Sequence, residues 1–235
     1  MEKTLLYHYT SLSHLIEIFK VGKVLTSQTE KMLKVKKPGL WFSTNSKWEY
    51  SAFKRFNDGK KEFDLNTPEE FEKYIGCARL ITNLNSLFVT FAKYKHKSKV
   101  NPLLWDKMAE IGKSKGADPS EWYATFSPMS INNLDIEIFE NGEWLSLKKG
   151  DGEFNTDLFN KNLEKTFVFK KGKEMEEQMM KEAQKQKKVV DEAVEQKVEE
   201  VVEEKVEEAV EEKVEEVVEE KVEEVVEEKV EEVVE

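Results

Sequence analysis

The sequence predicts an α+β body over roughly residues 1–170, followed by a long acidic tail without a core of its own. Strand-like segments lie toward both ends of the body with helical segments between them, which is typical of this class. All 5 Trp, 6 Tyr and 14 Phe lie in the body, enough apolar surface for one core. The last quarter has no aromatic residue, proline or glycine. We therefore expect a charged helical linker (171–196) and a repeat tail (197–235) after the body.

The first part of the body is predicted to form a strand, a helix and a second strand. Residues 5–9 are apolar and aromatic, which suits a strand, and Thr10 or Ser11 can cap the helix that follows. Gly22 is expected to end that helix. After a polar, lysine-rich stretch, residues 40–45 have the pattern of a buried strand.

The second part of the body is predicted to alternate between helices and strands. Residues 68–84 are predicted to be a helix, because Thr67 can cap it and Pro68 suits its first position. The pair Asn141-Gly142 predicts the tight turn of a hairpin. The other expected elements are a strand at 86–91, a helix at 102–112, a strand at 122–126 and the two hairpin strands at 136–139 and 144–147.

Charge is distributed unevenly along the chain. The net charge is −11, but residues 191–235 alone contribute −17, so the rest of the chain carries +6. Basic clusters that could meet phosphate, with Tyr94 as an interleaved aromatic, are Lys34, Lys36 and Lys37, and Lys93, Lys95, His96, Lys97 and Lys99. The alternative is a solvated lysine face. Only Arg55 and Arg79 are arginines, so base recognition through arginine is not expected.

Cysteine and hydropathy patterns predict a cytoplasmic address. Cys77 is the single cysteine, so an internal disulfide is excluded, and its apolar surroundings predict a core or surface position rather than a reactive one. The sequence shows neither a stretch of about twenty apolar residues nor a cleavable signal, so we expect no membrane partner.

The tail repeats an eight-residue unit, Lys-Val-Glu-Glu-Val-Val-Glu-Glu, that begins at Lys197 and departs from the pattern at Ala209. Its valines recur every fourth position, so the apolar stripe winds around a helix and matches neither coiled-coil repeat. Glutamates four residues apart also repel each other. We expect a marginal helix or a disordered segment. It would act as a solvating, weakly self-associating extension, or it would contact the basic body.

Familiar catalytic motifs are absent from the sequence: the Gly-rich phosphate loop, Gly-x-Ser-x-Gly, Cys-x-x-Cys and His-Glu-x-x-His. With three histidines, no metal site is expected. Polar residues instead follow the two predicted apolar strands, namely His8, Tyr9 and Thr10 after the first and Ser43, Thr44 and Asn45 after the second. These side chains are expected to hydrogen-bond a ligand, or else to serve as strand-end caps and turn residues.

These segments resemble a known family. Residues 7–11 and 40–49 resemble the opening of ADP-ribosyltransferase-like proteins of the histidine-containing branch, which includes toxins that modify DNA bases. The block Gly-Ala-Asp-Pro-Ser-Glu-Trp-Tyr at 116–123 and the closing Asn-Gly-x-Trp hairpin resemble an uncharacterised bacterial and phage family. The resemblance covers about residues 5–147. It implies a small split antiparallel sheet with flanking helices that clasps NAD as a substrate.

The resemblance also implies roles for the polar residues. His8 would contact the adenosine-side ribose, Tyr9 or another aromatic would stack on nicotinamide, and Ser43 and Asn45 would support the ribose. Arg79 would meet the pyrophosphate. Thr10 and Trp48 complete the set of cofactor-binding candidates.

The transfer reaction leaves positive charge on the nicotinamide ribose, so a carboxylate is needed to hold its 2′-hydroxyl. Glu121, beside Trp122 at the start of a strand, is the first candidate, and Glu49 is the second. A solvated surface position is the alternative for each.

The sequence departs from the pattern of the arginine-specific transferases. Their Glu-x-Glu or Gln-x-Glu motif has its nearest counterpart at 135–137, which begins with aspartate. The acceptor, a protein or a nucleic acid, therefore stays open. Two other functions remain: a non-catalytic phage or plasmid binding module for a nucleotide or a host protein, and a structural protein that acts through its acidic tail.

Overall fold

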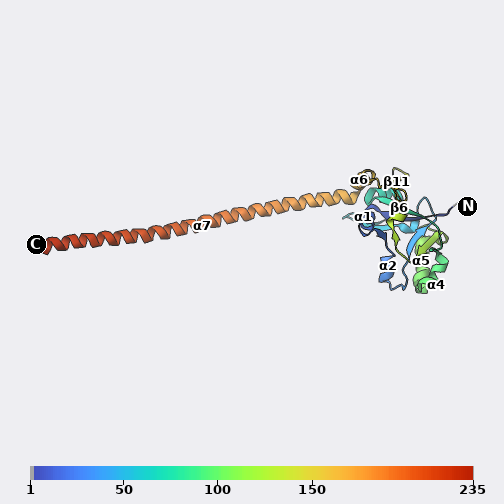
Figure 1. Ribbon diagram of the computed structural model, residues 1–235, viewed down its shortest axis with the longest axis horizontal. Helices are drawn as coiled ribbons and strands as arrows, with labels where there is room; N and C mark the ends of the chain where they lie inside the picture. The colour runs from blue at the N-terminus through green and yellow to red at the C-terminus, as the bar shows by residue number, and fades with distance from the viewer. Residues whose placement is uncertain (1–2, 235) are drawn as a thin grey trace. The chain divides into compact units, whose positions relative to one another are not determined.

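The structure is a computed structural model that describes the backbone of residues 3–234 (Figure 1). Side chains are described through residue 191 and at scattered positions up to residue 213. The chain divides into two compact units, Met1–Lys173 and Glu174–Glu235. The first unit contains the sheet and the core, and it is the body to which the following description refers.

The body is built on a seven-stranded antiparallel sheet in the order β11-β10-β6-β1-β3-β8-β7. Its strands are β1 (Leu5–Ser11), β3 (Leu40–Ser43), β6 (Cys77–Asn83), β7 (Val89–Thr90), β8 (Trp122–Thr125), β10 (Asp135–Glu140) and β11 (Glu143–Lys148). Two further pairs are β2 (Lys23–Val24) with β9 (Met129–Ser130), and β4 (Lys54–Asn57) with β5 (Glu62–Leu65). The α+β class is thereby confirmed.

The α-helices lie between the strands in chain order, except for the last two, which follow β11. The α-helices are α1 (Leu12–Val21), α2 (Gln28–Met32), α3 (Pro68–Tyr74), α4 (Phe91–Ser98), α5 (Pro102–Ser114), α6 (Thr156–Lys165) and α7 (Phe167–Val234). Single 3-10 turns are η1 (Tyr50–Ala52), η2 (Pro119–Glu121) and η3 (Ile131–Asn133). No described helix is long and apolar enough to cross a membrane.

The sheet consists of two halves joined at a narrow seam. β1 pairs with β6 at seven consecutive positions, from Leu5↔Asn83 to Ser11↔Cys77. Its pairing with β3 on the other side is registered at one position, Tyr7↔Ser43. The strands β11, β10, β6 and β1 therefore form one half and β3, β8 and β7 the other, and the seam between them positions the site described below.

Local sequence signals predicted several elements correctly. Ser11 caps α1, because its side chain accepts a hydrogen bond from the His14 backbone N–H, and Gly22 ends the helix in the left-handed conformation. Asn141 and Gly142 both have positive φ at the turn between β10 and β11. This geometry matches the right-handed twist of a hairpin, which is why the pair was a reliable signal.

The predicted helix over 68–84 was wrong beyond its first two turns. Helix α3 ends at Tyr74, Gly76 turns the chain at φ 72°, and Cys77–Asn83 forms the central strand β6. The first five residues of this strand are buried, because it has a neighbour on each side and packing on both faces. A short apolar run of this kind has no alternation that separates a buried strand from a helix. Cys77 is buried, as a core position requires.

Other boundaries also differ from the predictions. The strand predicted at 86–91 is limited to Val89–Thr90, because Thr90 caps helix α4. The lysine-rich stretch before β3 contains α2, and the β4–β5 hairpin has no counterpart among the predicted elements. Linker and tail form one helix, α7, whose described side chains are exposed from residue 170 onward. Its first residue, Phe167, packs on Phe56 and Tyr74 of the body.

An ion pair between β10 and α6 makes the body sensitive to acid. Glu140 is 5% exposed, and its carboxylate lies 2.9 Å from Lys161 Nζ and also contacts Lys165. Hydrogen bonds from Lys165 and Lys161 lower the pKa of Glu140 to about 2. Because this pKa is lower than in the unfolded chain, the pair stabilises the fold above about pH 4.5 and loses its effect as pH falls toward about 2.

We expect Glu140→Gln to lower the free energy of unfolding by about 1–2 kcal/mol at pH 7, a range that allows for solvent screening of the two exposed lysines. The difference from the parent chain should shrink steadily below pH 4.5. Urea unfolding followed by tryptophan fluorescence at several pH values measures both effects. Glu143→Gln, on the exposed first residue of β11, is the matched control. An equal loss at pH 7 and pH 2.5 would contradict the assignment.

Candidate functional site

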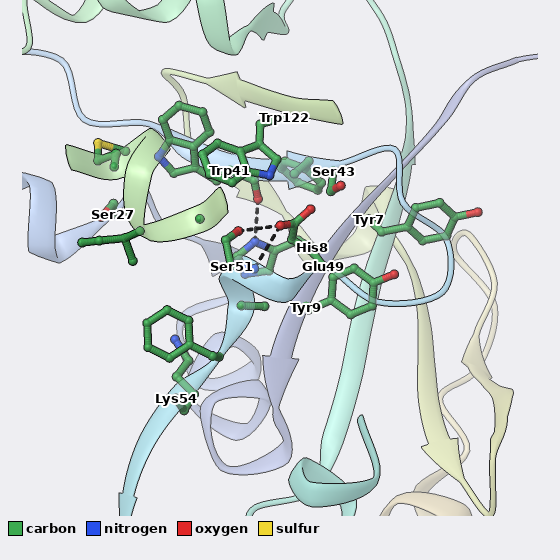
Figure 2. Close-up of a pocket in the computed structure, with 16 residues that line it drawn as sticks. Tyr7, His8, Tyr9, Ser27, Trp41, Ser43, Glu49, Ser51, Lys54 and Trp122 are labelled. Atoms are coloured by element: carbon green, nitrogen blue, oxygen red, sulfur yellow. Dashed lines mark hydrogen bonds between the residues drawn. The ribbon is translucent and has the colours of Figure 1, made fainter. Parts of the chain in front are cut away.

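A pocket of about 400 Å³ lies beside the seam between β1 and β3 (Figure 2). Strands of both halves of the sheet, the segment around η1 and helix α5 contribute to its wall. The lining residues are Tyr7, His8, Tyr9, Ser27, Trp41, Phe42, Ser43, Glu49, Ser51, Ala52, Phe53, Lys54, Met108, Ile111, Gly112 and Trp122. The volume is in the range of small-molecule sites, and so is the mixture of many apolar groups with few polar ones.

His8 enters the pocket as a neutral imidazole. Its Nδ1 lies 2.8 Å from the carbonyl oxygen of Trp41, and a carbonyl can only accept, so Nδ1 carries the proton. Nε2 is then an acceptor, and no residue of the described chain hydrogen-bonds to it. Burial lowers the pKa of His8 to about 4, and positive charge on Lys54 contributes to the shift. At neutral pH the ring therefore offers the pocket an uncharged acceptor with a fixed orientation.

Glu49 provides a buried carboxylate with one free oxygen. Its side chain caps η1, because Oε1 accepts hydrogen bonds from Ser51 N at 3.0 Å and from Ser51 Oγ at 2.7 Å. The second oxygen, Oε2, is buried and has no hydrogen-bond partner among the described residues. The residue is 6% exposed, and Figure 2 shows Ser51 holding one side of the carboxylate. A buried polar atom without a partner destabilises a fold by about 1–3 kcal/mol, so this oxygen requires an explanation.

Trp122 provides a second unpaired polar atom on the pocket wall. Its indole Nε1 is buried and has no hydrogen-bond partner among the described residues. The ring packs edge-on against Phe91 at 5.0 Å and lies directly over Gly112 of helix α5, where a Cβ atom would come within 2.2 Å of the indole. Glycine at this helix position is what lets Trp122 form part of the wall.

Lys54 supplies positive charge to the same pocket. It is the first residue of β4 and is exposed, and desolvation beside the pocket wall lowers the pKa of its ammonium group below the usual value. A lysine beside a neutral histidine and a carboxylate can bind a phosphate group as a point charge. The pocket thus combines an acceptor, a carboxylate and a cation on an otherwise apolar wall.

Four of the nine candidate residues line this pocket. They are His8, Tyr9, Ser43 and Glu49. The Tyr9 hydroxyl donates to the carbonyl oxygen of Asn45 at 2.6 Å, and burial raises its pKa above the usual range, so this hydroxyl is a neutral donor that holds the chain after β3. Ser43 is 1% exposed, and its Oγ accepts from Asn45 N at 3.1 Å.

The other five candidates lie outside the pocket wall. Glu121 ends η2, where its backbone oxygen accepts from Thr44 N at 3.0 Å. Thr10 is buried, and its Oγ1 has no partner among the described residues. The Asn45 side chain accepts from the Lys47 and Trp48 backbone N–H groups and so forms the turn after β3. The remaining two residues are Trp48, whose backbone N–H belongs to this turn, and Arg79, which donates to the carbonyl oxygen of Ser46 in it.

Arg79 is held by the protein itself. Its Nε donates to Glu137 Oε2 at 2.7 Å, and its Nη1 donates to the carbonyl oxygen of Ser46. Its guanidinium also lies over the rings of Tyr7 and Trp144, 4.8 Å and 4.2 Å from their centroids. With these partners it fixes the β3–η1 segment on the sheet. Trp48 has a similar role, because it is buried and its Nε1 donates to the carbonyl oxygen of Asn66 at 2.7 Å.

Sequence reasoning missed Ser51, Lys54, Trp122 and the α5 wall. Ser51 and Lys54 follow Glu49 closely in the chain; Ser51 lies in η1, and Lys54 begins the β4–β5 hairpin, which was not predicted. Trp122 lies in the block that resembles the bacterial and phage family, where it was read as a neighbour of Glu121. Within the described side chains, no group of three or more His, Cys, Asp or Glu is arranged to hold a metal ion.

Comparisons with models of protein families, with curated proteins and with solved structures gave no match.

Proposed function

We propose that this protein binds NAD in the β1–β3 pocket and transfers its ADP-ribose group, or hydrolyses NAD when water is the acceptor. The observation that carries this proposal is the unpaired, buried Oε2 of Glu49 beside the neutral ring of His8. The reaction class requires a carboxylate of this kind. The acceptor, a protein or a nucleic acid, is not specified by the pocket.

Glu49 takes the catalytic role in this proposal. The bond between C1′ of the nicotinamide ribose and the ring nitrogen breaks, its electron pair leaves with nicotinamide, and the ribose becomes oxocarbenium-like. A carboxylate that accepts from the 2′-hydroxyl stabilises this charge, and it does so more strongly at a site from which water is excluded. The acceptor then adds to C1′ and loses its proton. Glu121, outside the pocket wall, has no comparable access.

The remaining polar groups of the pocket suit the rest of NAD. Nε2 of His8 accepts from a ribose hydroxyl, because Nδ1–H is already engaged by Trp41. Lys54 meets the pyrophosphate in place of Arg79, whose donors bind Glu137 and Ser46. The aromatic side chains of Tyr9, Phe42 and Trp122 provide apolar surface for a planar base.

The narrow seam of the sheet supports the same proposal. A split antiparallel sheet that clasps NAD is what the resemblance of the sequence implies. In this fold a single registered pair joins β1 to β3, and the pocket lies beside it. The resemblance and the pocket thus point to the same strands, although they were reached from different observations.

The test is incubation of the full-length protein with NAD, with and without mixed protein, DNA and RNA acceptors, while nicotinamide release is followed. We expect release above the uncatalysed rate and label on one acceptor class. Equilibrium NAD binding is measured in parallel. Binding without release would favour the non-catalytic binding module, and absence of both would overturn the proposal.

A further inference from the structure

The structure joins two basic segments that are far apart in the sequence. Segments 31–37 and 93–99 hold eight lysines and His96 but neither aspartate nor glutamate. The backbone N–H of Lys37 donates to the carbonyl oxygen of Ser98 at 3.2 Å, and Figure 1 shows α2 and α4 at the same end of the body. We call these two segments together the basic surface.

Buried contacts fix the two segments on each other. Tyr94 of α4 is 0% exposed, and its hydroxyl donates to Glu30 Oε2 at 2.6 Å while also lying 3.2 Å from the carbonyl oxygen of Lys37. Val35 and Val100 belong to the same core cluster as Tyr94. Tyr94, the aromatic interleaved with the lysines, therefore does not meet a ligand beside them. Its ring is the anchor beneath the lysines and is not available for stacking.

The lysines of the basic surface are free to bind a partner. Those exposed are Lys31, Lys34, Lys36, Lys37, Lys93, Lys97 and Lys99, and Lys95 is half-buried. None of them forms a salt bridge with an acid of the described residues. The surface thus concentrates positive charge that the fold itself does not neutralise.

We infer that the basic surface binds the phosphate backbone of nucleic acid without sequence preference. Lysines are point charges that neutralise phosphates, whereas base readout depends on arginine forks and amide side chains, and both arginines of the chain lie elsewhere. Protein interfaces are depleted in lysine and enriched in buried aromatic anchors, and the one aromatic residue in these two segments is buried. This inference does not depend on NAD chemistry.

An anionic membrane fits the surface less well. Membrane-surface binding uses an amphipathic helix with a continuous apolar face. Helix α2 has five residues, and the exposed apolar side chains in the two segments are Met32 and Leu33. Ser27, which caps α2, also lines the pocket and precedes the basic surface in the chain.

Fluorescence anisotropy of a labelled oligodeoxynucleotide with the full-length protein, at several salt concentrations, tests this inference. Two variants neutralise one segment each, Lys36→Gln with Lys37→Gln, and Lys93→Gln with Lys97→Gln. Each pair should weaken binding about tenfold and lower the slope of log K against log salt by about 2, one per lysine. The matched control is Lys60→Gln with Lys61→Gln, in the exposed β4–β5 turn. It should leave the slope unchanged.

Four results would overturn the inference that the basic surface binds nucleic acid. An equal loss in the control pair would show a response to net charge alone and would overturn the inference, as would a loss in only one of the two segments. Absence of binding by the parent protein at low salt, or binding to phosphatidylserine vesicles but not to the oligonucleotide, would overturn it as well. Circular dichroism of each variant shows that the fold is retained.

Discussion

Glu49→Gln should lower the rate of nicotinamide release by about a thousandfold while changing NAD affinity by less than about tenfold. The amide keeps Oε1 as the acceptor for Ser51, so the local structure is retained, but the negative charge that faces the ribose is lost. Groups that act on charge developing in the transition state affect turnover far more than ground-state binding. Single-turnover release and equilibrium binding of NAD measure the two quantities separately.

Glu121→Gln is the matched control, because it makes the same change at the other carboxylate considered for this role. We expect turnover within about twofold of the parent protein, since Glu121 lies outside the pocket wall. A large loss at Glu121 with little loss at Glu49 would reverse the assignment. The stability of Glu49→Gln should be equal to or greater than that of the parent chain, because a neutral amide replaces a buried carboxylate whose second oxygen has no partner.

Gly112→Ala should destabilise the protein by about 1–2 kcal/mol, although alanine is the better helix former. Helix propensity alone would favour alanine by about 1 kcal/mol. Here, however, the added methyl group would come within 2.2 Å of the Trp122 ring, which is packed against Phe91 on another side. Overpacking of this kind costs about 1–3 kcal/mol, and displacement of the indole would also narrow the pocket. Urea unfolding and NAD binding measure the two consequences.

Gly172→Ala is the control for this prediction. Gly172 lies in helix α7, and nothing is within 4 Å of the position a Cβ atom would take. The change should raise the free energy of unfolding by about 0.5–1 kcal/mol or leave it unchanged. If Gly112→Ala stabilised the chain to the same extent, the close packing of α5 on Trp122 would be disproved.

Much of the local structure could be predicted from residues that act on their own neighbours. Ser11 and Gly22 bound α1, Thr67 caps α3, and Asn141 with Gly142 forms the hairpin turn. Each of these signals depends on backbone conformation within a few residues, so it can be recognised from a single sequence. The same is true of the first strand, although His8, Tyr9 and Thr10 lie within β1 and not after it as predicted.

Features that depend on long-range packing could not be predicted in this way. Strand β6 was predicted as part of a helix. It is a strand because β1 and β10 pair with its two edges, and two core clusters bury its two faces. Arg79 was predicted to bind a ligand, but its Nε donates a hydrogen bond to Glu137 of β10. Lys54 is exposed, as its sequence suggests, but the fold places it at the pocket with His8 and Trp122. In each case the partner lies far along the chain.

The sequence by itself determined the α+β class, the capped helices, the division between an aromatic body and an acidic repeat, and His8 and Ser43 as residues of one pocket. Only the tertiary structure decided that Glu49 rather than Glu121 faces that pocket, and that two lysine segments form one surface. The physical reason is that helix caps and turns are set by local backbone geometry. Burial, side-chain direction and charge pairing are set by contacts between segments that lie far apart in the chain. Such contacts leave no local pattern in the sequence.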